Sequence, residues 1–123
     1  MIELTVPLGD RSYPVLVGHG ARHRLLELLP IGVKRAAIVT QASIPVTVDP
    51  GVDHRVFTMD EGEHGKDLGT VEDLCRDWAH WGLNRGDCVV AVGGGVVTDT
   101  AGFAAAVYHR GIPVVHVATT LLG

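Results

Sequence analysis

The chain has 123 residues, which is enough for one domain with a substantial core. Hydrophobic residues make up 46% of the sequence and aromatic residues only 5%, so the core has to be built mainly from aliphatic side chains. The net charge is -4 and no cluster of Lys and Arg occurs, which argues against a nucleic-acid-binding protein, because contact with phosphate backbones requires concentrated positive charge.

The N-terminal segment predicts neither a signal peptide nor a membrane anchor. It contains an acid at Glu3 and no long apolar run, and no stretch reaches the roughly 18 apolar residues of a membrane span. Cys75 and Cys88 form no CxxC pair, so we expect reduced, partly buried thiols. These features favour a cytoplasmic protein.

The first half of the chain predicts a hairpin, a short helix and two strands. Residues 2–6 and 13–17 alternate in hydropathy around a turn at residues 9–12. Leucines at residues 25–29 predict a short amphipathic helix that ends at Pro30 and Gly32. Two further strands are predicted at residues 36–40, which are continuously apolar, and at residues 55–59.

The second half predicts two helices that alternate with buried strands. Thr70 and Asp73 have the spacing of a capping box, and one helix face carries Val71, Leu74, Cys75, Trp78 and Trp81 before Gly82 ends the helix. A turn at residues 84–87 leads to a strand at 88–92, a helix to about Tyr108, and a strand at 114–117. This alternation predicts an α/β domain with a Rossmann-like parallel sheet, flanking helices and an N-terminal β-hairpin.

Three successive glycines, Gly93, Gly94 and Gly95, follow a buried strand and precede a helix. Glycine lets the backbone approach a ligand closely, and the start of a helix offers unpaired N–H groups and the positive end of the dipole. The pattern is typical of a phosphate or diphosphate site, although tight packing of helix on strand would also explain it. GxGxxG is not met, because Thr98 occupies the third glycine position, and the P-loop pattern is absent.

Several other polar positions are candidates for ligand contacts. Asp99 lies in the first turn of the glycine-rich helix, where an acid either stabilises the dipole or accepts from sugar hydroxyls. The loop at residues 61–66 carries two carboxylates and Lys66, which is also what a solvated loop contains. Thr119 and Thr120 follow a strand, and Arg110 could clamp a phosphate or be an ordinary surface arginine. None of the seven histidines has zinc-ligand spacing, so we expect no metal ligand.

Together these segments resemble the 3-dehydroquinate synthase family, in the same order along the chain. Residues 93–103, GGGVVTDTAGF, are similar to that family's GGGVVGDLAGF, and residues 104–111, AAAVYHRG, to its AA.Y.RG. Residues 117–123, VATTLLG, are similar to its VPTTLL, and residues 61–66, EGEHGK, to its DGExxK. Four elements in the right order make the resemblance specific.

The resemblance implies that residues 1–123 are an N-terminal NAD-binding domain. It places the adenosine half of NAD at Glu63 and Lys66, and the nicotinamide-side ribose at Asp99. Arg110 would reach the substrate phosphate, usually across a dimer interface. The implied cofactor contacts are, in full, Glu63, Lys66, Gly94, Gly95, Val96, Val97, Thr98, Asp99, Thr119 and Thr120.

The implied reaction converts 3-deoxy-D-arabino-heptulosonate 7-phosphate to 3-dehydroquinate and phosphate with catalytic NAD, in aromatic amino acid biosynthesis. In the family a divalent metal, zinc or cobalt, and most substrate lysines belong to a second, mostly helical domain. We therefore expect no metal ligand and no catalytic residue in residues 1–123, and no turnover by them alone. The chain stops directly after a buried strand, so we also expect it to be a fragment, and the full-length protein to be a homodimer.

The sequence departs from the family pattern at several positions. Thr98 replaces a glycine, Thr100 a leucine and Ala118 a proline, while Gln41 and Ser43 stand where an Asp or Asn is frequent. Thr98 needs room beside the diphosphate, but its hydroxyl could also donate to it.

Four alternatives stay open. A related sugar phosphate cyclase of the 2-epi-5-epi-valiolone synthase type would share the NAD domain. An iron-type alcohol or glycerol dehydrogenase has a similar GGGSxxDxAK motif, although residues 101–103, Ala-Gly-Phe, lack the lysine with which that motif ends. The remaining two are a non-catalytic nucleotide-binding module and a purely structural α/β domain.

Overall fold

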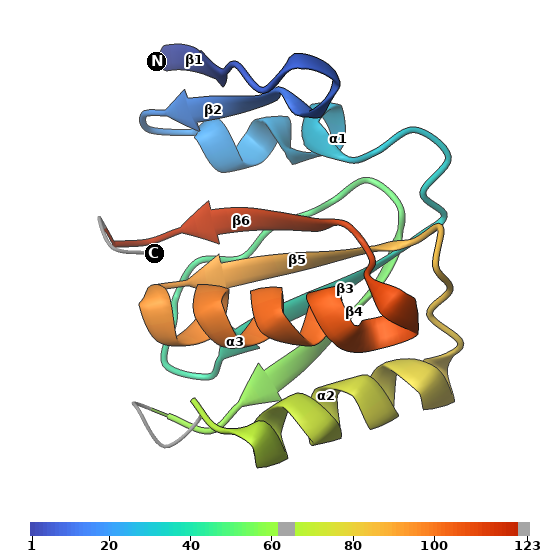
Figure 1. Cartoon of the computed structure of the whole chain (residues 1–123). Coiled ribbons are helices and arrows are strands. Elements are labelled where there is room, and N and C mark those ends of the chain that lie inside the picture. Colours follow the sequence, from blue (N-terminus) through green and yellow to red (C-terminus); the bar gives the residue numbers. More distant parts are fainter. Residues whose placement is uncertain (62–65, 121–123) are drawn as a thin grey trace.

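The computed structural model describes residues 1–61 and 66–120 (Figure 1). Its strands are β1 (Ile2–Val6), β2 (Tyr13–Val17), β3 (Arg35–Gln41), β4 (Asp53–Met59), β5 (Cys88–Gly93) and β6 (Val114–Ala118). Its α-helices are α1 (Leu25–Leu28), α2 (Leu68–Trp81) and α3 (Gly95–Val107). Short 3-10 helices lie at Gly9–Arg11, Ala21–Arg24 and Tyr108–Arg110.

The four later strands form a parallel sheet in the order β4-β3-β5-β6, and β1 and β2 form a separate antiparallel hairpin. Val39 in β3 pairs with Ala91 in β5 on one side and with Phe57 in β4 on the other. Figure 1 shows α2 and α3 together on one face of this sheet, with the hairpin beyond α1. The predicted α/β fold with a parallel sheet and an N-terminal hairpin is confirmed.

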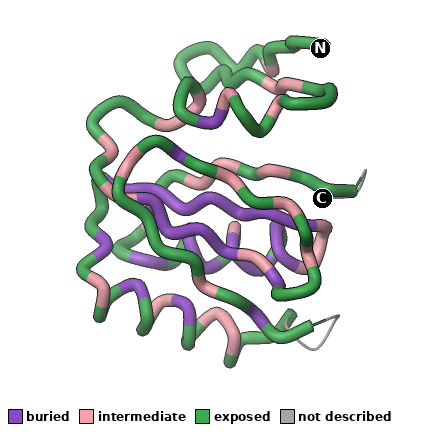
Figure 2. The backbone as a smooth tube through the Cα atoms, turned by 180° about the vertical axis from the view of Figure 1, so that it is seen from behind, coloured by how far each residue is buried: buried purple, intermediate pink, exposed green. Residues whose placement is uncertain are grey.

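The central strands are buried on both faces, which explains their continuous apolar sequence. In β5, Val89 and Ala91 pack toward α2 and α3, whereas Val90 and Val92 pack on the opposite face. Every residue of β5 is buried. Figure 2 shows this burial at the centre of the sheet and the exposed backbone of the hairpin above it.

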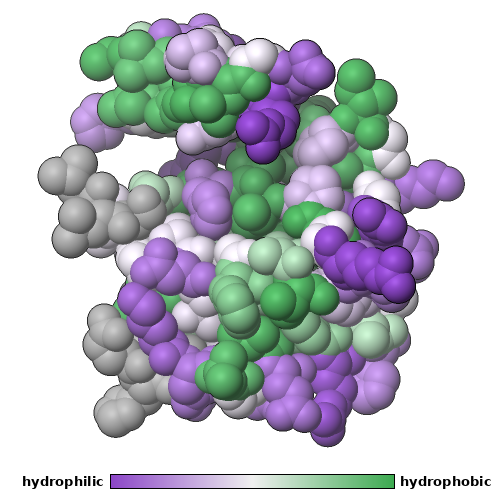
Figure 3. Space-filling model, in the orientation of Figure 1, coloured by the Kyte–Doolittle hydropathy of each residue, from purple (hydrophilic) through white to green (hydrophobic). Residues whose placement is uncertain are grey.

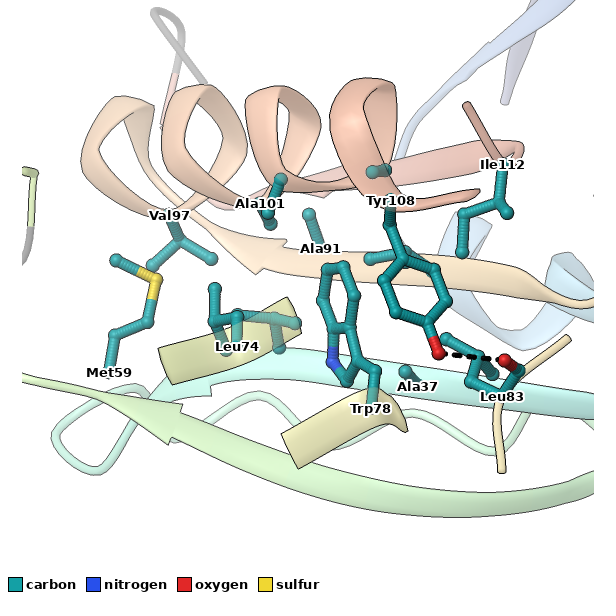
Figure 4. Close-up of a cluster of buried hydrophobic side chains, with 14 residues drawn as sticks. Ala37, Met59, Leu74, Trp78, Leu83, Ala91, Val97, Ala101, Tyr108 and Ile112 are labelled. Atoms are coloured by element: carbon teal, nitrogen blue, oxygen red, sulfur yellow. Dashed lines mark hydrogen bonds between the residues drawn. The ribbon is translucent and has the colours of Figure 1, made fainter. Parts of the chain in front are cut away.

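The main core lies between the sheet and the two long helices. On α2, Leu74 and Trp78 are buried, and Val71, Cys75 and Trp81 are half-buried against the same core, so the predicted helix face is confirmed. Trp78 meets the ring of Tyr108 edge-on at 5.4 Å. The Tyr108 hydroxyl donates to the carbonyl of Leu83 at 2.8 Å, which satisfies this buried polar group (Figure 4).

The predicted capping box of α2 is wrong. The helix begins two residues earlier, at Leu68, and its N-cap is Asp67, whose carboxylate accepts from the Thr70 amide at 2.8 Å. That hydrogen bond lowers the pKa of Asp67. An Asp that accepts from the amide three residues later is a favoured N-cap, so the helix begins directly after Asp67. Gly69, in the first turn, is a weak helix former but does not prevent this start.

Parallel strands β3 and β4 are joined without a helix. Residues 42–52 cross the face of the sheet opposite α2 and α3, and Ile44, Val46 and Val48 pack against it. A parallel crossover usually contains a helix, so this extended connection is a departure from the common pattern.

None of the helices in the described ranges is long and apolar enough to cross a membrane. Cys75 is half-buried and Cys88 buried, and both thiols are free, as predicted. Burial raises the pKa of the Cys88 thiol to about 12, so this cysteine is protonated and unreactive near neutral pH.

Candidate functional site

The candidate site lies where the parallel strands end. The connection from β3 to β4 crosses one face of the sheet, whereas α3, which joins β5 to β6, covers the other. The chain therefore leaves the neighbouring strands β3 and β5 toward opposite faces, and the region outside their carboxyl ends, called the crevice below, is where open parallel α/β sheets bind ligands. Gly93–Gly95 lie at the β5 side of this crevice.

The glycine turn is tightly packed. Gly93 has a φ of 155°, and a Cβ placed there would lie 2.8 Å from both Ile44 Cδ1 and Val97 Cγ2. A Cβ on Gly94 would lie 3.2 Å from both Oγ1 and Cγ2 of Thr120. Packing, one of the two predicted explanations, therefore accounts for Gly93, and Gly94 lets the loop after β6 come close.

The start of α3 presents backbone N–H groups to this crevice. Gly94 is the N-cap residue and its carbonyl accepts from Val97 and Thr98 at 3.1 and 3.0 Å. Within residues 1–61 and 66–120, the amides of Gly95 and Val96 have no backbone acceptor. A helix start with two such donors and no side-chain cap attracts an anion.

Val97 and Thr98, two residues of α3 that were predicted to contact the cofactor, can reach a ligand only through their backbone. Val97 is fully buried in the main core. Thr98 is buried, and its hydroxyl donates to the Gly94 carbonyl at 3.2 Å, the usual bond of a threonine to the preceding helical turn. The structure thus gives Thr98 room without placing its side chain in the crevice.

Lys66 and Asp99 are brought together although they are 33 residues apart in the sequence. The Lys66 ammonium lies 2.9 Å from Asp99 Oδ2, and both side chains are exposed. The sequence predicted Asp99 in the first turn of this helix, but α3 begins at Gly95 and its first turn contains no acid, so Asp99 lies in the second turn. The pair links the segment before α2 to this second turn and offsets the negative charge of Asp99 near the helix start. Glu63, the other predicted contact in this loop, lies outside the described residues.

Thr119 and Thr120 also lie beside the glycine turn. The Thr119 amide donates to the Gly93 carbonyl at 3.0 Å and extends the pairing of β5 with β6. Thr120 covers Gly94, and both threonines are exposed. The structure therefore places them at the same end of the sheet as Gly94, Gly95 and Asp99.

Arg110 lies elsewhere. It follows α3, whose 13 residues separate it from the glycine turn by roughly 20 Å at 1.5 Å per residue. Arg110 is exposed with a φ of 66°, next to His109 with a φ of 47°. Within one copy of the chain the structure does not bring Arg110 to the glycine turn.

Gln41 and Ser43, which depart from the family pattern at the end of β3, both contact residues that follow β4. Gln41 is buried, and its amide donates to the Asp60 carbonyl at 2.7 Å. The Ser43 hydroxyl donates to the carboxylate of Glu61. These bonds hold the ends of β3 and β4 together at the rim of the crevice.

The sequence did not single out His116 or Thr100 as site residues. His116 lies on β6 and faces α3, since a Cβ on Gly102 would lie 3.3 Å from its Cε1. Burial lowers the pKa of His116, and the nearby negative charge of Asp99 opposes this shift. Only the alternation along β6 could have indicated that His116 shares a side with Asp99.

The described residues contain no group of three or more His, Cys, Asp or Glu side chains that could hold a metal ion. The residues present therefore do not form a metal site, and no chemical step through a metal can be derived from them. The arrangement fits a ligand with an anionic group at Gly95 and Val96 and with polar groups near Lys66 and Asp99.

Sequence comparisons identify relatives along the whole chain. The family model described as 3-dehydroquinate synthase N-terminal matches residues 56–123. A protein of Amycolatopsis mediterranei (strain S699), described as a candidate aminodehydroquinate synthase, is 45% identical over 98% of this chain and 35% of its own length. The 3-dehydroquinate synthase of Mycobacterium leprae (strain TN) is 39% identical over 93% of this chain and 34% of its own.

Two solved structures share the fold. A 2-deoxy-scyllo-inosose synthase has a TM-score of 0.83 and 25% identity, over 97% of this chain and 36% of that one. The 2-epi-5-epi-valiolone synthase of Streptomyces hygroscopicus subsp. jinggangensis 5008, with NAD+ and Zn2+ bound, has a TM-score of 0.72 and 27% identity, over 94% and 35%. The chain spans about a third of the length of the relatives it matches. Because the family model covers more than half of the chain, the chain belongs to the 3-dehydroquinate synthase N-terminal family.

Proposed function

We propose that residues 1–123 form the NAD-binding domain of a 3-dehydroquinate synthase, which converts 3-deoxy-D-arabino-heptulosonate 7-phosphate to 3-dehydroquinate and phosphate. One observation carries the proposal: at the crevice between β3 and β5, the open amides of Gly95 and Val96 lie at the start of α3, in a chain of this family. This is the geometry that a dinucleotide diphosphate requires.

Each residue at the crevice has a defined task in this proposal. The amides of Gly95 and Val96 bind the diphosphate, and Thr119 and Thr120 line the cofactor. Asp99 accepts from ribose hydroxyls, and its pairing with Lys66 keeps its charge from repelling the diphosphate. When bound, NAD supplies a reversible hydride acceptor for the substrate carbinol.

The remaining parts of the proposal concern the whole protein. The divalent metal, zinc or cobalt, and most substrate contacts belong to segments other than residues 1–123. Arg110, far from the glycine turn within one copy, reaches the substrate phosphate from a partner copy in a homodimer. The protein acts in the cytoplasm on a sugar phosphate.

A second candidate function is the synthesis of aminodehydroquinate. It is favoured by the 45% identity to the Amycolatopsis protein, compared with 39% to the Mycobacterium leprae 3-dehydroquinate synthase. The similarity to the valiolone synthase keeps that third cyclase activity as an outcome of the same test.

Calorimetry with NAD tests the cofactor site. We expect the chain to bind NAD, and Asp99→Asn to weaken binding by about two- to tenfold, because a neutral amide oxygen is a weaker acceptor for the ribose hydroxyls than a carboxylate. Asp73→Asn is a matched control, because Asp73 is an exposed carboxylate on α2 away from the crevice. Absence of NAD binding to folded protein contradicts the proposal.

Phosphate release tests the activity. The full-length protein is assayed with 3-deoxy-D-arabino-heptulosonate 7-phosphate, with the corresponding amino sugar phosphate, and with sedoheptulose 7-phosphate. We expect the first substrate to be turned over, and residues 1–123 alone to release no phosphate. Turnover of only one of the other two identifies the alternative cyclase, and NAD binding without any turnover identifies a nucleotide-binding module.

A further inference from the structure

His116 lies on the side of β6 that faces α3, and the proposed cofactor contacts do not include it. A Cβ placed on Gly102 would lie 3.3 Å from His116 Cε1 and 3.8 Å from its Nε2, so the ring packs against α3 at a position where glycine makes room for it. His116 is nevertheless an exposed residue. The ring is therefore held between strand and helix while it keeps access to solvent and its protons.

Asp99 is the neighbour of Gly102 on the surface of α3. The Cβ positions of residues three apart on a helix are separated by about 5–6 Å. Because the His116 ring touches Gly102, a rotation of the Asp99 side chain is enough to bring the carboxylate to the ring. Desolvation against α3 lowers the pKa of His116, and the negative charge of Asp99 opposes this shift, as expected for two groups that lie close together.

The Asp99 carboxylate already has one cationic partner. The Lys66 ammonium contacts its Oδ2 at 2.9 Å, and the two side chains are 46% and 58% exposed. Figure 3 shows apolar side chains gathered over α3 with hydrophilic residues beside them, so a charge on this face has partly apolar surroundings. A carboxylate has two acceptor oxygens, and Oδ1 is the one that a second partner would take.

The other elements around His116 contribute no competing carboxylate in the described residues. On β5 its pairing partner is Ala91, and Val114 precedes it on the same side of β6. The segment before α2 contributes Asp67 besides Lys66, and the Asp67 carboxylate caps α2. Asp99 is therefore the acid with which a charged His116 would pair.

We propose that His116 controls the availability of Asp99: the neutral ring leaves the second carboxylate oxygen to a cofactor ribose, and the protonated ring takes that oxygen. Histidine is the side chain that changes charge between about pH 5 and pH 8, whereas Lys66 stays charged throughout this range. The role of the ribose rests on the proposed function. The pairing of His116 with Asp99 is a property of the chain itself.

A protonated His116 has two opposing effects on a bound dinucleotide. It removes an acceptor from the ribose by direct contact, and it attracts the diphosphate at the start of α3 from a distance. His116 pairs with Ala91, two residues before Gly93, so roughly 7 Å of strand separate it from the glycine turn. Solvent and salt weaken an attraction over that range, so the direct contact dominates. NAD affinity should therefore fall when His116 gains a proton.

Titration of the His116 ring by NMR tests the pairing without any cofactor. We expect Asp99→Asn to lower the pKa of His116, because it removes the charge that stabilises the imidazolium. Lys66→Met should raise it, because the carboxylate then has no ammonium on Oδ2. An unchanged pKa of His116 in Asp99→Asn would overturn the proposal, whether or not the chain binds NAD.

Calorimetry with NAD at about pH 8 and about pH 5 tests the consequence. We expect binding to be about two- to fivefold weaker at the lower pH, the range of one exposed ion pair. His116→Gln, whose amide is neutral at both pH values, should bind like the unaltered chain at the higher pH and lose most of the difference. His80→Gln, at an exposed position in the last turn of α2, should keep the full difference.

Two results of the calorimetry would contradict control by His116: stronger binding at the lower pH, or a difference that survives in full in His116→Gln. Absence of NAD binding at both pH values would contradict the proposed function instead. The NMR titration would then still decide whether His116 and Asp99 pair.

Discussion

The N-terminal hairpin and the parallel sheet differ strongly in the burial of their strands, and therefore in how much each contributes to stability. Every residue of β5 is buried, whereas Ile2 and Leu4 in β1 are 58% and 55% exposed. Neither of the two core clusters contains a described residue before Leu25. A two-stranded hairpin is marginally stable by itself. The sheet with α2 and α3 therefore carries the stability of the molecule, and the hairpin depends on it.

The same contrast applies to function. The predicted ligand contacts in the described residues lie on α3, in the turn after it or in loops that flank the strands and helices of the parallel sheet, and none lies in the hairpin. Parallel strands fixed on both faces place the loops after β3, β5 and β6 in a constant arrangement, which a preorganised binding site requires. Substitutions in the parallel sheet and its helices should therefore change folding or binding, whereas substitutions in the hairpin should change neither.

The largest effect is expected from Leu74→Ala in α2. Leu74 is 4% exposed and packs between α2, α3 and the sheet, so its truncation leaves a cavity in the main core. We expect the free energy of unfolding to fall by about 2–5 kcal/mol in urea denaturation monitored by circular dichroism. A loss below about 1 kcal/mol would mean that the core can collapse around the missing side chain, and the contrast between the two regions would be smaller than the burial indicates.

The glycine turn should be the next most sensitive position. Gly93→Ala introduces a Cβ at 2.8 Å from two side-chain carbons and strains a φ of 155°. We expect a loss of about 2–4 kcal/mol from backbone strain and overpacking together. Gly86→Ala is the matched control, because a Cβ there meets nothing within 4 Å and Gly86 has no positive φ. Equal melting temperatures for the two variants would contradict the packing explanation of Gly93.

Local patterns predicted the elements of the sheet and the helix face, because the burial of β5 and the spacing of Leu74 and Trp78 on α2 are properties of adjacent residues. Features that depend on contacts between distant segments could not be predicted in this way. Asp87 is buried and its carboxylate accepts from the amides of Lys34 and Arg35, more than 50 residues away. The sequence indicates only a turn at this position.

For the candidate site, the glycine turn, Asp99 and Lys66 were predicted, but their relation to one another was not. The ion pair between Lys66 and Asp99 exists because α2 and α3 start at the same end of the sheet, which no spacing along the chain expresses. The Thr100 hydroxyl, which has no hydrogen-bond partner within residues 1–61 and 66–120, is likewise identified only once both helices are placed. Sequence reasoning identified the chemical groups, and the topology decided which of them meet.

The smallest effect is expected from Leu4→Ala in the hairpin. Leu4 is 55% exposed and pairs with Val15 across the hairpin, so its truncation removes little buried surface. We expect a change in the free energy of unfolding within about 0.5 kcal/mol, together with faster hydrogen exchange of the β1 amides than of the β5 amides. If Leu4→Ala instead lowers stability by as much as Leu74→Ala, the apolar face of Ile2, Leu4 and Val17 must be covered in solution. Repeating the measurement across protein concentrations would then decide whether a second copy of the chain covers it, because only that loss would depend on concentration.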